Sequence, residues 1–232
     1  MMSFLLRRDR YHPTDETVEV ARAAYAAARE AEPSPFWWAV FDLGFVLLWH
    51  GDLDEATAVL RESLAEAERR GDVTTRSRAL TYLMVAGRKR GDVEGVRGAI
   101  GPVIEGAREA SLPEYEAMAI ANRAWVAWRG GDQATAAADA QAALRMWEGL
   151  PVRYFFDWMA LWPLAAIALA SQHIEQAAEY ARGMLPPPQQ LLQEPARTLA
   201  QDAVHAWDAD QPAKTEELLH RAVGAAGDLG YL

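Results

Sequence analysis

Apolar residues recur every three or four positions along most of the chain, the spacing that places them on one face of an α-helix. Leu53, Ala56, Leu60, Leu64 and Ala67 form one such series. Short polar turns separate successive series. The pattern predicts eleven helices, near residues 14–31, 36–51, 53–70, 73–90, 92–110, 113–130, 132–149, 152–171, 173–184, 190–208 and 210–228.

A glycine–aspartate pair marks the turns between helices. Gly51-Asp52, Gly91-Asp92 and Gly131-Asp132 follow one another at intervals of forty residues, and degenerate copies surround His173 and Asp210. Glycine adopts the left-handed conformation that ends a helix, and aspartate caps the next helix by accepting from its free N–H groups. Because these turns are short, neighbouring helices are expected to be antiparallel. The period predicts a stack of helix hairpins.

Each hairpin has an apolar face too wide to bury alone, so stacking makes the hydrophobic core continuous. The predicted fold is therefore all-α, a right-handed superhelical solenoid of paired helices. We expect residues 1–13 to form a tail and residues 14–232 to form a single domain. The first helix lacks a complete partner before it, so a fragment of a longer array is one alternative. The expected pairs lie near 36–70, 73–110, 113–149, 152–184 and 190–228.

Charge argues against nucleic acid as a direct partner. The formal net charge is -10, and the longest basic cluster is Arg88-Lys89-Arg90. An acidic surface repels phosphate backbones, and three basic residues are too few to offset it. The chain has no cysteine, which removes disulfides and thiolate chemistry and fits a reducing cytoplasm.

Membrane insertion is not expected either. The most apolar segment runs from Tyr154 to Ala170, but it carries Asp157 and Pro163 and only just reaches the length of a span. The first eight residues place their charges after the apolar run, the reverse of a signal peptide. We therefore predict a cytoplasmic protein with a buried core helix over this segment.

Residues of the first full pair resemble the tetratricopeptide repeat family. Leu43, Gly44, Leu47, Ala56 and Leu60 fall where that family places its small and large packing residues. The period near forty exceeds the usual thirty-four. The chain is more similar to the long-helix variant found beside ATPase modules in bacterial LuxR-type transcription regulators and in class III nucleotide cyclases. The match weakens later, where the Gly44 position holds Met84, Ala124, Ala165 and Asp202.

The resemblance implies a concave groove lined by the first helix of each pair. Aromatic, Met and basic side chains at the matching positions would suit an amphipathic partner helix or an apolar peptide with acidic groups. The alternative is that these aromatic residues belong to the core. The Asn of the family's chaperone-binding clamp is missing, so that subtype is excluded. The candidate groove residues are Trp38, Phe41, Phe45, Trp49, Arg78, Arg88, Lys89, Met118, Trp125, Trp128, Arg129 and Trp162, with Leu48, Thr81, Val85, Ala121 and Met159 between them.

Catalytic and metal-binding motifs are missing from the sequence. There is no Gly-x-Ser-x-Gly elbow, no His-Glu-x-x-His pattern and no Walker motif. Asp52, Asp72, Asp92 and Asp132 occupy capping positions, so we interpret them as helix caps rather than catalytic carboxylates. No enzymatic activity, cofactor or metal is expected.

Three classes of function follow from these patterns. The first is a protein-interaction scaffold, the regulatory or sensor portion of a bacterial signalling protein, binding a peptide or other domains of its parent protein. The alternative is a sensor that holds a small apolar ligand in a Trp-lined concavity. The third, an enzyme on a helical scaffold, lacks convergent polar groups. Self-association into a homo-oligomer stays open, because aromatic residues exposed in a groove could serve that purpose.

Overall fold

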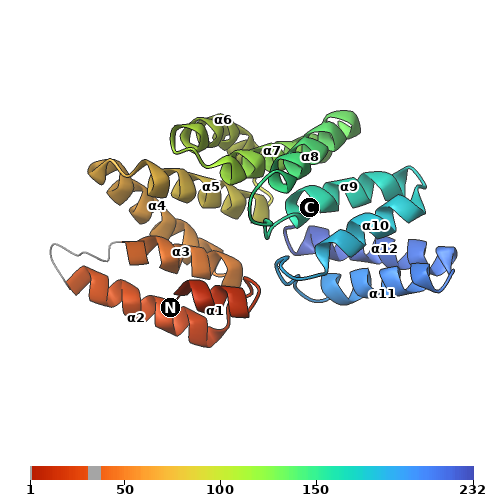
Figure 1. Ribbon diagram of the computed structural model, residues 1–232, viewed down its shortest axis with the longest axis horizontal. Coiled ribbons are helices and arrows are strands. Elements are labelled where there is room, and N and C mark those ends of the chain that lie inside the picture. Colours follow the sequence, from red (N-terminus) through yellow and green to blue (C-terminus); the bar gives the residue numbers. More distant parts are fainter. Residues whose placement is uncertain (1, 31–37) are drawn as a thin grey trace.

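The structure is a computed structural model that describes residues 2–30 and 38–232, and within them α-helices are the only regular elements (Figure 1). The described helices are α1 (Met2–Arg8), α2 (Asp15–Glu30), α3 (Trp38–His50), α4 (Leu53–Arg70), α5 (Val73–Lys89), α6 (Val93–Glu109), α7 (Pro113–Arg129), α8 (Gln133–Glu148), α9 (Trp158–Ala170), α10 (Ile174–Met184), α11 (Ala196–Asp208) and α12 (Pro212–Asp228).

Three predicted boundaries are wrong. The predicted tail contains α1, because Met2 and Leu6 are apolar at helical spacing and are buried against the rest of the chain. The helix expected from 152 begins at Trp158, and the one expected from 190 begins at Ala196. The latter follows Pro195, which has no N–H to continue a helix from upstream. Residues 36 and 37, at the predicted start of the second helix, lie outside the described part.

The turn glycines adopt the conformation that their pattern predicts. Gly71, Gly91 and Gly131 have φ angles of 69°, 71° and 81°, all in the left-handed region. The degenerate turns reach the same region without glycine, since φ is 59° at Gln172 and 55° at Asp210. The turns therefore share a left-handed backbone conformation, and glycine is not required to reach it.

Most of the paired aspartates cap the helix that follows them. Asp72, Asp92 and Asp132 accept a hydrogen bond from the backbone N–H three residues later, at 2.9, 2.9 and 3.0 Å. Asp52 departs from the prediction, because its carboxylate lies 2.8 Å from Nδ1 of His50 and makes no side-chain capping bond. The imidazole at the end of α3 competes successfully with the free N–H groups of α4.

Sequential hairpin packing produces a solenoid-like array. Each helix contacts the next along the chain, and α3, α5, α7 and α9 also contact one another in that order as an inner row. The small packing residue of the first pair works as expected, since a Cβ added at Gly44 would lie 2.8 Å from Cγ of Leu60. The last hairpin is turned differently: α12 packs against α9 and α10.

The two ends of the array are joined by the loop after α1. Arg10 donates from Nε to the Gln189 carbonyl at 2.9 Å and from Nη2 to the Leu185 carbonyl at 2.8 Å. The Leu191 N–H donates to the Arg10 carbonyl at 2.9 Å. Figure 1 shows a curved array, with α1 to α4 at the left, α6 to α8 at the top and α9 to α12 at the right.

Aromatic side chains fill much of the space inside this curve. Trp49 of α3 stacks on Phe156 at 4.8 Å between ring centroids, and Tyr231 lies 4.7 Å from Trp158. Phe156 comes from the segment before α9, and Tyr231 comes from the tail after α12. A large apolar concave face is stabilised by removal from water. In this protein the segment before α9 and the tail after α12 cover the concave face and remove its apolar side chains from water.

Candidate functional site

Most predicted groove side chains are buried, so the prediction that they face an open groove is wrong for them. For most of them the physical reason is the cover just described, because segments before α9 and after α12 pack on the inner faces of α3, α5 and α7. Trp125 is buried instead in a second cluster with residues of α5 and α6. They therefore form core contacts between helices. The buried members of the set are Phe41, Phe45, Trp49, Arg88, Met118, Trp125 and Trp162.

The other five candidates are partly or fully accessible. Trp38 is 47% exposed, and Arg129 at the end of α7 is exposed. Arg78, Lys89 and Trp128 are half-buried. The twelve side chains are thus divided between the core, the surface and one pocket, and they do not form a continuous wall.

Arg88 has a structural role in this arrangement. Its Nη2 donates to the carbonyl of Met159 at 3.0 Å and to that of Tyr231 at 2.6 Å. The guanidinium lies 5.6 Å from the ring of Trp125 and 5.2 Å from that of Trp158. Burial lowers the pKa of Arg88 to about 9. The side chain ties the tail to α9 through backbone carbonyls and cation–π contacts.

One cavity on the inner side of the array has the volume and the lining of a binding pocket. Its volume is about 370 Å³, and it lies between α1, α3, α5, α7 and residues 150–155. Phe45 and Arg78 are the members of the predicted groove set that line it. The other apolar or hydroxyl-bearing lining residues are Met2, Ser3, Leu6, Tyr11, Tyr82, Tyr115, Leu150, Pro151, Val152, Tyr154 and Phe155.

The pocket walls are aromatic, and some of their rings pack edge to face. Tyr82 lies 4.7 Å from Phe45 and 6.0 Å from Tyr115, both in T-shaped contacts. Tyr11 lies 4.8 Å from Phe155. Burial raises the pKa of Tyr82 well above 10, so its hydroxyl stays protonated and can donate a hydrogen bond. Flat rings with hydroxyl groups favour a planar apolar ligand that carries a few polar atoms.

Five charged side chains are among the described lining residues: Arg7, Arg78, Arg153, Asp42 and Glu114. These described side chains carry three positive and two negative charges, a formal excess of +1 (three minus two), within a chain whose formal net charge is -10. The local excess of positive charge distinguishes this pocket from the protein as a whole.

Arg78 is the half-buried cation of the pocket. Its guanidinium carbon lies 4.1 Å from the centroid of the Phe41 ring. Burial opposes its charge, but Tyr115, Tyr82 and Asp42 outweigh burial and raise the pKa of Arg78 above its ordinary value. Burial also raises the pKa of the Asp42 carboxyl, and Arg78 only partly offsets that effect.

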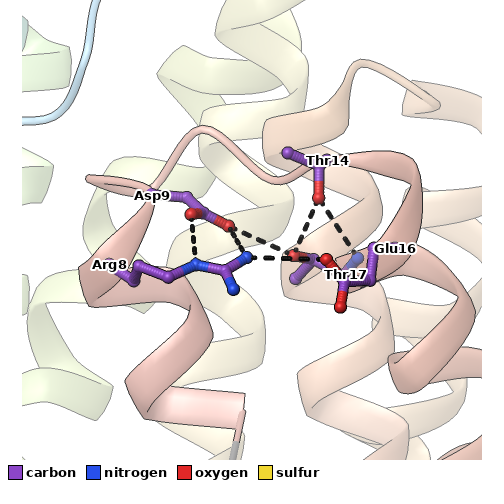
Figure 2. Close-up of polar contacts among 5 residues, drawn as sticks. All are labelled: Arg8, Asp9, Thr14, Glu16 and Thr17. Carbon is purple, nitrogen blue, oxygen red and sulfur yellow. Dashed lines mark hydrogen bonds and ion pairs between the residues drawn. The ribbon is translucent and has the colours of Figure 1, made fainter.

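The α1 wall is held in place by a polar cluster at its end (Figure 2). Arg8 donates to both carboxylate oxygens of Asp9, at 2.7 and 3.0 Å. The buried Thr17 hydroxyl donates to the same carboxylate at 3.3 Å, and Thr14 lies 3.3 Å from that hydroxyl. These contacts join α1 to the first turn of α2, so the pocket has a defined wall on this side.

The opposite wall, residues 150–157, is held by Gln189. Its Nε2 donates to the Tyr154 carbonyl at 2.9 Å and to Oδ2 of Asp157 at 2.7 Å, and its Oε1 accepts from the Asp157 N–H at 3.0 Å. These bonds satisfy backbone groups that a helix would otherwise pair. They explain why helix α9 begins only at Trp158.

Replacement of Asp157 by Asn should change how stability depends on pH. Burial raises the pKa of Asp157 from 3.8 to about 6, against the weaker opposite effects of Arg153 and Gln189. Between these values the folded state keeps a proton that the unfolded chain has lost. The contribution of Asp157 to stability therefore falls as the pH rises from about 4 to about 6, by about 2–3 kcal/mol at most.

Asp157→Asn removes this charge and keeps an oxygen for Gln189. We expect its free energy of unfolding in urea to exceed that of the wild type by about 1–2 kcal/mol at pH 7.5 and to match it near pH 4. Asp202→Asn, at an exposed position of α11, is the control and should follow the wild type at both values. An Asp157→Asn difference that does not depend on pH would contradict the assignment.

Several pocket residues were missed because the sequence reasoning followed tryptophan. Four of the seven tyrosines, Tyr11, Tyr82, Tyr115 and Tyr154, line the pocket. Asp42 carried a usable signal, because it is the single charged residue between Trp38 and Trp49 in an otherwise apolar helix. An acid in such a run is costly to bury unless something polar faces it.

Comparisons with known proteins do not add an identity. No family model matches the chain, and no curated protein matches it. Within the described residues, no three side chains of His, Asp or Glu are grouped so as to hold a metal ion. No helix in that part combines the length and the apolar character needed to cross a membrane.

Proposed function

We propose that this chain is a non-enzymatic binding module whose pocket between α1, α3, α5, α7 and residues 150–155 takes a small amphipathic molecule. The observation that carries the proposal is the cavity of about 370 Å³, with aromatic walls and a few charged groups. Small-molecule sites have this composition and volumes of about 300–1,000 Å³.

A small ligand is favoured over a partner helix because the inner face has little free apolar surface. Phe156 covers Trp49, and Tyr231 packs on Trp158 and Trp162. A partner helix would have to displace these segments and expose their rings to water. A molecule that fits the existing cavity has no such cost.

The wider role that we propose rests on the family resemblance. As a tetratricopeptide-like array, the chain would be the sensor portion of a larger bacterial signalling or transcription-regulatory protein in the cytoplasm. Binding in the pocket would bridge α1, α3, α5 and α7 and so couple the ligand to the packing of successive repeats. Such coupling is how a sensor would report to neighbouring domains.

A peptide partner is the second candidate. Exposed apolar side chains favour it, because Phe4 is 70% exposed on α1 and Val152 is 67% exposed on the opposite pocket wall. Such side chains often mark contact sites for other proteins when they gather at one place. A peptide bound here would insert a single side chain into the pocket.

Filling the pocket by mutation tests the proposal. Ser3 is exposed on α1 and lines the pocket, so Ser3→Trp should occupy the cavity without disturbing the core. Ser171→Trp, at the exposed end of α9, is the matched control. A fragment library is screened by saturation-transfer NMR against the wild type and both variants.

We expect fragments that bind the wild type and Ser171→Trp and lose at least about tenfold in affinity with Ser3→Trp, since an indole would occupy their place. Circular dichroism should show the same helicity in all three proteins. Fragments that bind all three proteins equally, or a library without any binder, would show that this cavity is not a ligand site.

A further inference from the structure

The pocket contains a cation without an acidic partner at contact distance. Among the described residues no carboxylate oxygen lies within 4.0 Å of an Arg78 nitrogen, whereas Arg153 reaches Asp157 at 4.0 Å. The Nε of Arg78 is also buried without a hydrogen-bond partner in the described part of the chain. A half-buried guanidinium gains from a bidentate anion, because its planar donors match a carboxylate.

The other charges of the pocket restrict which anion fits. Asp42 and Glu114 line the same cavity as Arg78. A dianion such as a phosphate monoester would be repelled by both carboxylates more strongly than a monoanion. The described lining residues include no lysine and no glycine-rich loop, the usual elements of a phosphate site.

The walls restrict the rest of the ligand. Tyr82, Tyr115 and Phe45 line the cavity together with Arg78 and contact one another through Tyr82. Tyr11 and Phe155 also line it, and Tyr11 lies 6.2 Å from Phe45. Aromatic rings bind one another in offset or edge-to-face contacts, with an energy beyond that of the buried area. A planar ring system is the body that these walls accommodate best.

We infer that the pocket selects a small aromatic monocarboxylate, whose carboxylate pairs with Arg78 and whose ring lies among Tyr82, Tyr115 and Phe45. This inference rests on the proposed function and names its ligand class. Asp42 acts as the selectivity element, because its carboxylate disfavours a second negative charge in the pocket.

Two matched probes distinguish the contribution of the carboxylate to binding from that of the aromatic ring. The test measures binding of 2-naphthalenecarboxylate and its neutral isostere 2-naphthalenecarboxamide by isothermal titration calorimetry at pH 7.5. Wild-type protein should bind the carboxylate at least about 10-fold more tightly, the effect of one charged hydrogen-bonded contact. Arg78→Gln should reduce the two affinities to within about 2-fold of each other. Arg129→Gln, at an exposed arginine outside the pocket, should keep the wild-type ratio.

A second variant keeps the inference testable if Arg78→Gln does not fold. Asp42→Asn removes the neighbouring negative charge, so the preference for the carboxylate should increase by about 3-fold or more. Loss of structure cannot produce such a gain. Equal affinities of both probes for the wild type, or a preference that Arg78→Gln leaves intact, would overturn the inference while the proposed function stands. Binding of neither probe to the wild type would count against both.

Discussion

Trp125→Ala should lower the free energy of unfolding by about 3–5 kcal/mol, the range for removing a buried tryptophan. Trp125 has an exposed fraction of 0% and packs with Met84, Val96 and Val126 in the core between α5, α6 and α7. Alanine would leave a cavity that the surrounding helices can only partly close. Urea denaturation followed by far-ultraviolet circular dichroism measures the change.

Trp128→Ala on the same helix is the matched comparison. Trp128 is half-buried, so its removal should cost about 1 kcal/mol. The family resemblance placed both tryptophans in an open groove, where neither change would affect the fold strongly. A Trp125→Ala variant as stable as the wild type would restore the groove interpretation and contradict the burial described above.

Gly230→Ala should cost at least about 3 kcal/mol, because it combines a left-handed backbone with a steric clash. At Gly230 φ is 70°, and an added Cβ would lie 2.5 Å from the Lys89 carbonyl oxygen. That oxygen belongs to a helix backbone, so the tail must move instead. Its movement would withdraw Tyr231 and Leu232 from the core, where both are buried.

Gly71→Ala isolates the backbone contribution. Gly71 has nearly the same φ, 69°, but an added Cβ there would meet nothing within 4 Å. We expect it to cost about 1 kcal/mol, the strain of a non-glycine residue in this region. Equal losses for the two variants in chemical denaturation would mean that the tail does not pack against α5 in solution.

Local features of the fold were predictable because their causes lie within a few residues. The left-handed glycines and the capping aspartates act over one turn, so Gly91 and Asp92 end one helix and start the next. The same reasoning located every helix from α4 to α8 within a few residues. The same reasoning predicted that Asp52 caps α4, but its carboxylate contacts His50, two residues away, instead.

Features that depend on distant contacts were not predictable in this way. The bonds of Arg10 to Gln189 join residues 179 positions apart. No periodicity within a hairpin indicates that this loop, the segment before α9 and the tail would converge on the inner face. The prediction of an open groove failed for that reason. Arg78 and Phe45, which line the pocket, lie on inner-row helices that the period does locate.

Ring-labelled tyrosine NMR tests the central claim, that this pocket is where the protein binds its ligand. Fragments identified by screening are titrated into protein labelled with ¹³C in its seven tyrosine rings. Tyr25, Tyr180 and Tyr231 lie outside the pocket and serve as internal references. The account predicts that the resonances of Tyr11, Tyr82, Tyr115 and Tyr154 shift with a common affinity while the references stay fixed. Shifts confined to the references, or no shifts at saturating fragment, would contradict it.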